Sequence, residues 1–398
     1  MRFKSTILAA VAALALTSCA TDMASRPEAR AEAVTVSTPE TDMALDGAQV
    51  LAWNDATRSA RFRDMEAYFP GLEVAPSPRP RALPQGRPLP SSTAVMIDAY
   101  VNRGDTAGVM VLQDGRVRYE KYGLDFGPEQ RWTSFSVAKS LTSTLLGAAV
   151  RDGLVDMAAP VSRYIPGLRG SAYDEVTVEQ LATMTSGVKW NENYTDPNSD
   201  VAQMFNTPPQ PGQDQVVEYM KTLPREAPPG EKWVYKTGET NLIGVLVEMA
   251  TGRTLAAYAK EKIVDPAGFA DPLFWQTDFS NRNIGGCCLS LTLADYARFG
   301  QFVLDGGGQS VPAGWFAKAG APQVTFDNAP LPGFGYGYQW WTYPGGNYGA
   351  QGIFGQSITL VPQQDMVIAI LSNWPRATDQ GLSVERLALL AAIAAGAN

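Results

Sequence analysis

Residues 135–150 read FSVAKSLTSTLLGAAV, and this stretch indicates both the fold and the chemistry. Ser136 begins an apolar run that is long enough for a helix, and Lys139 lies in the first turn of that run. Three residues apart on a helix, the two side chains share one face. Burial would lower the pKa of the lysine, so that its amine could accept the serine proton. Backbone N–H groups at a helix start are also unpaired and suited to binding an oxyanion.

The same four-residue pattern occurs a second time, at Ser186 and Lys189. A chain of this size and composition contains about one such match by chance. Ser186 ends a helical stretch and is followed by Gly187, so Lys189 would not lie one turn further along a helix. We therefore expect Ser136, not Ser186, to be the nucleophile.

The sequence contains no histidine, which restricts the possible chemistry more than any other count. A Ser-His-Asp triad, a Cys-His pair and a histidine-ligated zinc site are all excluded. We see no calcium-loop spacing either, and we expect no metal and no cofactor. A net charge of −8 and a pI near 4.9 give no electrostatic support for binding nucleic acid.

The pattern on either side of residues 135–150 predicts one α+β sheet interrupted by a helical insertion. Strands are expected at 107–113, 116–122, 336–343, 357–361 and 366–372, with a hairpin turn at Asp114-Gly115. Helices are expected at 53–69, 135–150, 176–184, 240–251, 293–304 and 382–395, with Gly187 and Gly252 as stop signals. A proline-rich stretch at 76–90 predicts an extended crossing between the first helix and the first strand.

The N-terminus has the features of an export signal. A basic start precedes apolar residues 7–16, which are too few to span a bilayer, so residues 1–18 are expected to be a signal peptide. Residues 16–19, Leu-Thr-Ser-Cys, resemble a bacterial lipobox, which implies lipidation of Cys19 and attachment to a membrane. Ala20 resembles the signal for sorting to the outer membrane, facing the periplasm. The alternative is an ordinary signal peptide with a chance cysteine. Residues 19–46 are small, polar and charged, as expected of a flexible tether.

Two further cysteines, Cys287 and Cys288, are adjacent. A disulfide between neighbours would close an eight-membered ring that strains the peptide bond between them. We therefore expect two buried thiols in a tight turn.

The order and spacing of several motifs resemble those of the serine hydrolase superfamily of class C β-lactamases, penicillin-binding proteins and related esterases. The matching segments are FSVAKS at 135–140, LATMTSG at 181–187, PGEKWVYKTG at 229–238 and LSLTLADYARFG at 289–300. The run VKWNENY at 188–194 and the Tyr-x-Thr form of the third segment resemble the 6-aminohexanoate-dimer hydrolase branch.

This resemblance extends from about residue 94 to the C-terminus. It implies a β-lactamase/transpeptidase-like α+β fold, in which helices flank an antiparallel sheet and a helical subdomain is inserted. We accordingly expect a catalytic domain at 93–398, with the insertion at about 150–285. An N-terminal helix and the proline-rich crossing would precede it at 47–92.

The resemblance also implies roles for single residues. Tyr235 would point its phenol at Ser136 and exchange protons with the nucleophile and the leaving group. Thr237 stands where the lactamases have an asparagine that binds a substrate carbonyl. Tyr194 resembles a tyrosine that reaches the leaving nitrogen in the amide-hydrolysing branch, although it could also be an aromatic side chain of a surface loop.

The third family motif corresponds to residues 350–352, Ala-Gln-Gly. Gln351 and Gly352 would then lie at the substrate, and the N–H of Ile353 would be the second oxyanion donor beside that of Ser136. The motif's first position lacks the family's cation, which casts doubt on recognition of the carboxylate of β-lactams or D-Ala-D-Ala peptides. Trp341 could line the pocket, but at least one of Trp340 and Trp341 should be core, because adjacent strand residues face opposite sides.

Together these features predict a hydrolase that cleaves a small ester or linear amide through an acyl-enzyme on Ser136. Three alternatives remain open. The first is a β-lactamase or D,D-peptidase, and the second is a carboxylesterase with little amidase activity. The third is a catalytically idle lipoprotein that binds cell-wall peptides.

Overall fold

The computed structural model describes residues 33–39, 49–326 and 333–397. The expected signal peptide, Cys19 and most of the expected tether lie outside these residues. Part of the tether is described, and there the expectation of a flexible chain is wrong. Val34–Ser37 form strand β1, which pairs along its whole length with β2 (Gly71–Val74).

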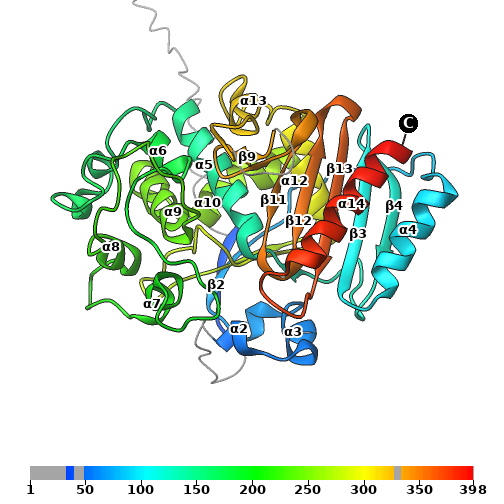
Figure 1. The fold of residues 1–398 in the computed structure, drawn as a ribbon, viewed down its shortest axis with the longest axis horizontal. Helices are drawn as coiled ribbons and strands as arrows, with labels where there is room; N and C mark the ends of the chain where they lie inside the picture. The colour runs from blue at the N-terminus through cyan, green and yellow to red at the C-terminus, as the bar shows by residue number, and fades with distance from the viewer. Residues whose placement is uncertain (1–32, 40–48, 327–332, 398) are drawn as a thin grey trace, which may run out of the picture.

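An eight-stranded antiparallel sheet forms the centre of the molecule (Figure 1). Its order is β4-β3-β13-β12-β11-β10-β9-β8. The strands are β3 (Thr106–Gln113), β4 (Arg116–Tyr122), β8 (Val324–Thr325), β9 (Gly335–Tyr336), β10 (Trp341–Thr342), β11 (Tyr348–Gln351), β12 (Ser357–Val361) and β13 (Met366–Ser372). The hairpin between β3 and β4 is confirmed, with positive φ at Asp114 and Gly115.

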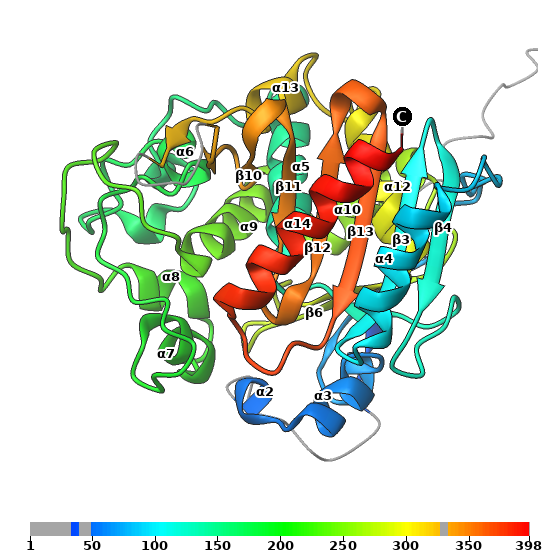
Figure 2. The same ribbon diagram turned by 45° about the vertical axis from the view of Figure 1, so that its right-hand side comes forward.

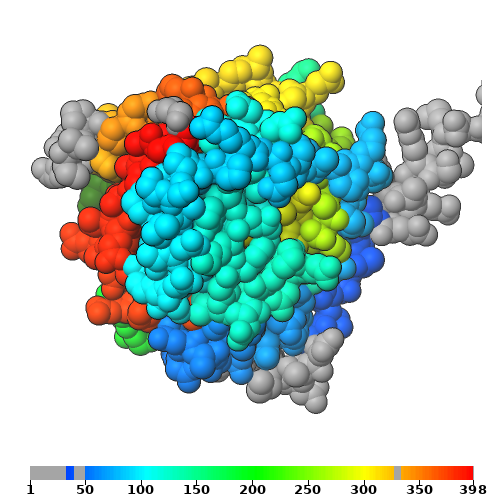
Figure 3. All heavy atoms as spheres, turned by 90° about the vertical axis from the view of Figure 1, so that its right-hand side faces the viewer, coloured from blue at the N-terminus to red at the C-terminus, as the bar shows by residue number. Residues whose placement is uncertain are grey.

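Helices cover both faces of this sheet. On one face, α4 (Ser91–Asn102) and α14 (Gln380–Gly396) lie side by side, so the C-terminal helix meets the beginning of the catalytic domain (Figures 2 and 3). Ile97 and Ile393 pack there against Val109 and Ile368. On the other face, α12 (Leu293–Leu304) packs against β3, β12 and β13. Because both faces are covered, β13 is buried throughout.

A helical region lies beside the sheet (Figure 1). Its centre is α9 (Thr237–Thr251), which packs against α5 (Ala138–Arg151). The other helices are α6 (Val178–Ala182), α7 (Asp200–Asn206), α8 (Gln215–Met220), α10 (Leu255–Ala259) and α11 (Asp265–Ala267). Short single-turn helices occur at Val161–Arg163 and Pro166–Leu168, and a π-helical turn at Lys260–Val264. Gly252 ends α9 with a φ of 67°, as expected.

A second sheet, which the sequence pattern did not predict, holds the residues before the proposed nucleophile. Its order is β1-β2-β6-β7-β5, where β5 is Trp132–Thr133, β6 is Leu273–Gln276 and β7 is Leu289–Leu291. These strands have two to four residues each, too few for an alternating pattern to be recognised. The prediction of one interrupted sheet is therefore incomplete.

Several predicted elements differ in extent. The helix expected at 53–69 is broken into α2 (Gln49–Ala52), α3 (Asp55–Arg61) and a turn at Met65–Ala67, because Asn54 caps α3 by accepting a hydrogen bond from the Thr57 N–H. The strand expected at 336–343 is interrupted between β9 and β10, where Gln339 has a φ of 61°. Gly187 does not stop a helix, since α6 ends five residues earlier.

The remaining elements are short. They are α13 (Trp315–Ala319) and the turns η2 (Phe135–Val137), η6 (Pro344–Gly346), η7 (Ile353–Gly355) and η8 (Pro362–Gln364). In the described part of the chain, no single helix is long and apolar enough to cross a bilayer. Taken together, the two helices of the bent pair Thr237–Thr251 and Leu255–Ala267 are long and apolar enough, by length and composition only.

Candidate active site

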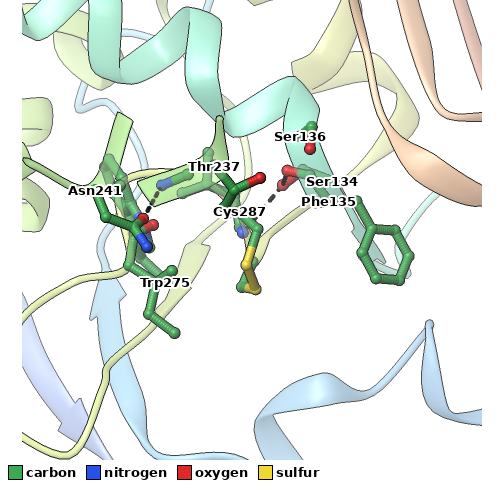
Figure 4. The surroundings of a disulfide bond; sticks show 12 residues. Ser134, Phe135, Ser136, Thr237, Asn241, Trp275 and Cys287 are labelled. Atoms are coloured by element: carbon green, nitrogen blue, oxygen red, sulfur yellow. Dashed lines mark hydrogen bonds between the residues drawn. A yellow bond between two sulfur atoms is a disulfide. The ribbon is translucent and has the colours of Figure 1, made fainter. Parts of the chain in front are cut away.

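Ser136 lies in the turn η2, immediately before α5, where its side chain is almost buried and lines a pocket. The second sheet fixes this turn. The N–H of Ser134 donates to the carbonyl of Leu289 at 2.7 Å, and the N–H of Leu289 donates to the Ser134 hydroxyl at 3.0 Å. Figure 4 shows Ser134, Phe135 and Ser136 at the start of the helix, with Cys287 beside them.

Lys139 lies one turn further along the helix, with 1% of its side chain exposed. Its Nζ is 3.1 Å from Ser136 Oγ, 3.0 Å from Thr237 Oγ1 and 2.7 Å from the Gly286 carbonyl oxygen. Burial lowers the pKa of Lys139 to about 8, and the charge of Glu192 opposes this shift. Roughly a tenth of the molecules therefore hold a neutral amine at pH 7.

The hydrogen bonds of Lys139 determine where a neutral amine would direct its lone pair. The Gly286 carbonyl can only accept a hydrogen. Thr237 Oγ1 also accepts from Lys139, because it donates its own hydrogen to Glu192. A neutral amine has two hydrogens for these two acceptors, so its lone pair faces Ser136 Oγ. This is the geometry of a base for the serine hydroxyl.

The second match to the pattern has a structural role instead. Ser186 is fully buried and donates to Glu239, whereas Lys189 is exposed. The second match therefore does not pair its serine with the lysine three residues later, and Ser136 stays the predicted nucleophile.

Tyr235 lies just before α9, with the Lys139 Nζ 5.3 Å from the centre of its ring. Burial raises the pKa of Tyr235 well above its ordinary value, Glu192 raises it further, and an interaction with the Ser136 hydroxyl opposes the shift. The phenol is therefore protonated at neutral pH. It can donate or relay a proton, but it is a poor base compared with Lys139.

The two adjacent tryptophans have different environments. Trp340 is fully buried in the core, as expected for one of the pair. Trp341 stacks on Tyr235, with ring centres 5.5 Å apart and an angle of 23°. It is not among the residues that line the pocket beside Ser136, so its observed contact positions the tyrosine.

Glu192 is a central residue that the sequence analysis missed. Its carboxylate accepts hydrogen bonds from the Thr237 N–H at 2.9 Å and from the Tyr194 hydroxyl at 2.7 Å, and also from the Thr237 hydroxyl and the Trp190 indole. It thus holds the start of α9 and Tyr194 together. The only signal in the sequence was the alternation within WNENY, which puts Glu192 and Tyr194 on one side of an extended segment.

Tyr194 lines the pocket with Ser136 and Thr237, so it is not a surface-loop aromatic. Burial raises the pKa of Tyr194 well above its usual value, and the charge of Glu192 adds to this. Its hydroxyl therefore remains protonated near the nucleophile.

The end of β11 packs directly against the nucleophile's backbone. A Cβ placed on Gly352 would lie 2.6 Å from the Ser134 carbonyl oxygen and 3.1 Å from the Ser136 nitrogen. Only glycine allows this approach. Ile353 follows at once and lines the same pocket as Ser136. The two backbone N–H groups expected to bind the oxyanion therefore come from adjacent segments.

Gln351 does not lie at the pocket, contrary to its expected role in substrate binding. Its Nε2 donates to the Tyr343 hydroxyl at 2.7 Å, and its Oε1 accepts from Arg386 at 2.6 Å. Both polar ends of the side chain are therefore held by the sheet and by α14. The physical reason is the strand's alternation, which directs Gln351 away from the face that Gly352 presents to Ser136.

Cys287 and Cys288 are joined by a disulfide, so the expectation of two thiols is wrong. Cys288 has a left-handed backbone with a φ of 73°, and both residues line the pocket. The turn also contains the Gly286 carbonyl that accepts from Lys139. Figure 4 shows the disulfide beside Ser136 and Thr237. The Gly286 N–H donates to the side-chain oxygen of Asn241 at 2.6 Å.

The pocket has a cavity volume of about 90 Å³ and combines residues from distant parts of the chain. Besides the residues already named, its lining comprises Val50, Leu51, Met65, Phe135, Val201, Ala202, Phe205, Gln276 and Ile284. No group of three or more acidic, cysteine or histidine side chains suited to a metal occurs in residues 33–39, 49–326 and 333–397.

Comparison with known proteins gives matches over most of the chain. The family model described as Beta-lactamase matches residues 96–393. The 6-aminohexanoate-dimer hydrolase of Paenarthrobacter ureafaciens is 33% identical over 291 residues, which cover 68% of this chain and 73% of that protein. Lovastatin esterase of Penicillium rubens is 27% identical over 190 residues, covering 44% of this chain and 46% of the esterase.

Solved structures share the fold. A putative 6-aminohexanoate-dimer hydrolase from Bacillus anthracis superposes with a TM-score of 0.75 at 20% identity, over 89% of this chain and 98% of that chain. A class C β-lactamase superposes with a TM-score of 0.58 at 16% identity, over 77% of this chain and 96% of that chain. At these identities the likeness shows the β-lactamase/transpeptidase-like architecture alone, which agrees with the predicted fold class.

Proposed function

Because this chain belongs to the Beta-lactamase family and is a serine hydrolase, we propose that it cleaves an ester or linear amide bond through an acyl-enzyme on Ser136. One observation carries the proposal. The buried Lys139 amine lies 3.1 Å from Ser136 Oγ, and two fixed acceptors take its hydrogens. The chain lacks histidine, so no imidazole competes for the role of base.

In the first step, Ser136 Oγ attacks the substrate carbonyl and its proton passes to Lys139 Nζ. The N–H groups of Ser136 and Ile353 stabilise the oxyanion. Tyr235 then gives its phenolic proton to the leaving oxygen or nitrogen and regains one from Lys139. Tyr194 lines the same pocket, and in this proposal it contacts the leaving group.

In the second step, water attacks the acyl-enzyme. Lys139 accepts a proton from this water, and the Ser136 oxygen regains a proton as the acid product departs. Nothing in this sequence of steps requires a cofactor.

The alternative of a β-lactamase or D,D-peptidase finds less support. Those substrates carry a carboxylate, whereas no cationic side chain is found in the described lining of the pocket. Thr237, in the position of the family's asparagine, is committed to Lys139 and Glu192. The catalytically idle binding protein is disfavoured because the relatives are named as hydrolases and the reactive geometry is retained.

The proposal for the cellular site rests on the sequence pattern of residues 1–20 alone. We infer that the chain is exported and held by a lipid on Cys19, on the periplasmic side of the outer membrane. The test is metabolic labelling with a radioactive fatty acid. We expect the wild-type protein to be labelled and the Cys19→Ala variant to remain unlabelled. Equal labelling of both proteins would contradict it.

The nucleophile is tested with the purified full chain, comparing wild type, Ser136→Ala and Ser186→Ala on a short-chain nitrophenyl ester. We expect Ser136→Ala to lose at least about a thousandfold in kcat, since the nucleophile itself is removed. Ser186→Ala, the matched control, should retain turnover if circular dichroism shows it folded. Full activity in a folded Ser136→Ala variant would refute the mechanism.

A further inference from the structure

The pocket beside Ser136 is apolar on several sides. The helix α7 contributes Val201, Ala202 and Phe205, and the disulfide closes another part of the wall. The polar side chains of the lining, apart from the nucleophile, are Tyr194, Thr237 and Gln276, all of them uncharged at neutral pH. In the described lining there is thus no charged side chain to pair with a charged substrate group.

The carboxylate that is hydrogen-bonded to two residues of the lining, Glu192, is already fully engaged. Glu192 lies behind Tyr194 and Thr237 and accepts four hydrogen bonds from protein groups. An ammonium group entering the pocket would lose water without finding a free carboxylate, and an entering carboxylate would find no cation. Removing either charged group from water without a partner costs free energy, whereas burying an alkyl chain is favourable.

The N-terminal segment at residues 49–69 forms a further wall. Val50 and Leu51 of α2 and Met65 line the pocket, although the family match begins only at residue 96. Phe62 of the same segment packs against Phe135, with ring centres 5.0 Å apart. Since Phe135 immediately precedes the nucleophile, this wall is fixed relative to Ser136.

We propose that this enzyme selects substrates with an uncharged, apolar aliphatic chain on one side of the scissile carbonyl, received by the N-terminal segment, α7 and the disulfide. The inference rests on the proposed function of Ser136 and names its substrate class. This substrate preference differs from that of a hydrolase that would bind the ammonium or carboxylate end of a substrate in the same pocket.

The test uses two series of esters and the purified full chain. In one series, nitrophenyl esters run from acetate to octanoate. In the other, butyrate esters carry alcohols of increasing length. We expect kcat/KM to rise about fourfold per methylene in one series, from the burial of each added group. The 6-aminohexanoate nitrophenyl ester should be roughly tenfold or more poorer than the heptanoate of the same chain length.

Two matched variants locate the effect. Phe205→Asp places a carboxylate in the pocket and should flatten the chain-length dependence while favouring the aminohexanoate ester. Phe279→Asp makes the same change at a phenylalanine that is 60% exposed and absent from the lining, and should leave both preferences unchanged. If Phe205→Asp does not fold, Leu51→Asp at the partly exposed rim gives the same comparison.

The outcomes separate the two proposals. Flat dependence in both series, or preference for the charged ester in wild type, would overturn the substrate class while activity remains dependent on Ser136. Hydrolysis that persists in Ser136→Ala would overturn the proposed function instead.

Discussion

Lys139 depends on its neighbours for the property that catalysis needs. Desolvation lowers the pKa of the Lys139 amine towards the working pH, and the charge of Glu192 limits how far that pKa falls. Glu192 also aligns Thr237, which takes one hydrogen of the amine. A single carboxylate that does not touch the nucleophile therefore affects both the protonation and the orientation of the base.

Glu192→Gln tests this arrangement. Removing the negative charge lets the pKa of Lys139 fall below about 8, so the neutral amine persists to lower pH. The acid limb of the kcat/KM profile should shift towards lower pH. Because an amide NH₂ cannot accept a hydrogen bond, kcat should also fall about tenfold. Profiles from about pH 5.5 to 9.5 provide the measurement, with Glu385→Gln, an exposed carboxylate paired with Arg103, as control. An unmoved acid limb would contradict this electrostatic role.

Gly352→Ala tests the contact between β11 and the nucleophile. The added Cβ would meet the Ser134 carbonyl and the Ser136 nitrogen, and would push the Ile353 N–H out of position. Loss of one oxyanion donor corresponds to a fall in kcat of about a hundredfold or more. Gly127→Ala is the control, because a Cβ there meets only Gln130, at 3.9 Å. Equal kcat in the Gly352 variant and wild type would contradict the assignment of Ile353.

At the scale of elements, the end of α3 supports both segments that carry the proposed oxyanion donors. Phe135 and Phe354 have left-handed backbones, with φ of 42° and 59°, which non-glycine residues adopt only when packing enforces it. Phe62, which directly follows α3 as its C-cap, packs on both rings, at 5.0 and 5.4 Å. The N-terminal segment therefore packs against the proposed active site.

Phe62→Ala should lower stability by about 3–5 kcal/mol through the cavity it leaves, and should also lower kcat. Phe302→Ala removes a ring that is also buried but packs against Phe316, outside the pocket lining. We expect a similar loss of stability there with kcat retained. Thermal unfolding and steady-state rates well below both melting temperatures separate the two effects. A parallel loss of kcat in both variants would mean that Phe62 acts through stability alone.

The turn that contains the disulfide supplies the Gly286 carbonyl to Lys139. Reduction of the disulfide with a dithiol should loosen this turn and lower kcat several-fold. Reoxidation should restore the original kcat. A Cys287→Ala/Cys288→Ala double variant should show the lower kcat and no response to the dithiol. Assays with and without dithiothreitol give the measurement. Unchanged turnover after the appearance of two thiols by mass would contradict a role in holding Lys139.

At the scale of the whole molecule, the sequence predicted the parts that depend on local pattern. The strands at 357–361 and 366–372 and the helix at 293–304 have the predicted bounds, because each carries a continuous buried or amphipathic pattern. Ser136 and Lys139 were predictable because their spacing within one helix already fixes their distance.

Features created by tertiary contact were not predictable in this way. Glu192, the disulfide and the N-terminal wall lie far from Ser136 in the sequence and are brought to the site only in the folded chain. The second sheet was missed because its strands are too short to show a period. Gln351 was placed wrongly because motif correspondence fixes a position along the strand but not which polar partners hold the side chain.

The most direct test of the account is the location of the acyl group during turnover. The purified chain would be mixed with excess nitrophenyl octanoate, quenched in acid within the first turnovers and digested for mass spectrometry. We predict one added octanoyl group on the peptide that contains Ser136, absent from Ser136→Ala and still present in Ser186→Ala. An octanoyl group on another residue, with turnover retained in Ser136→Ala, would contradict the central claim.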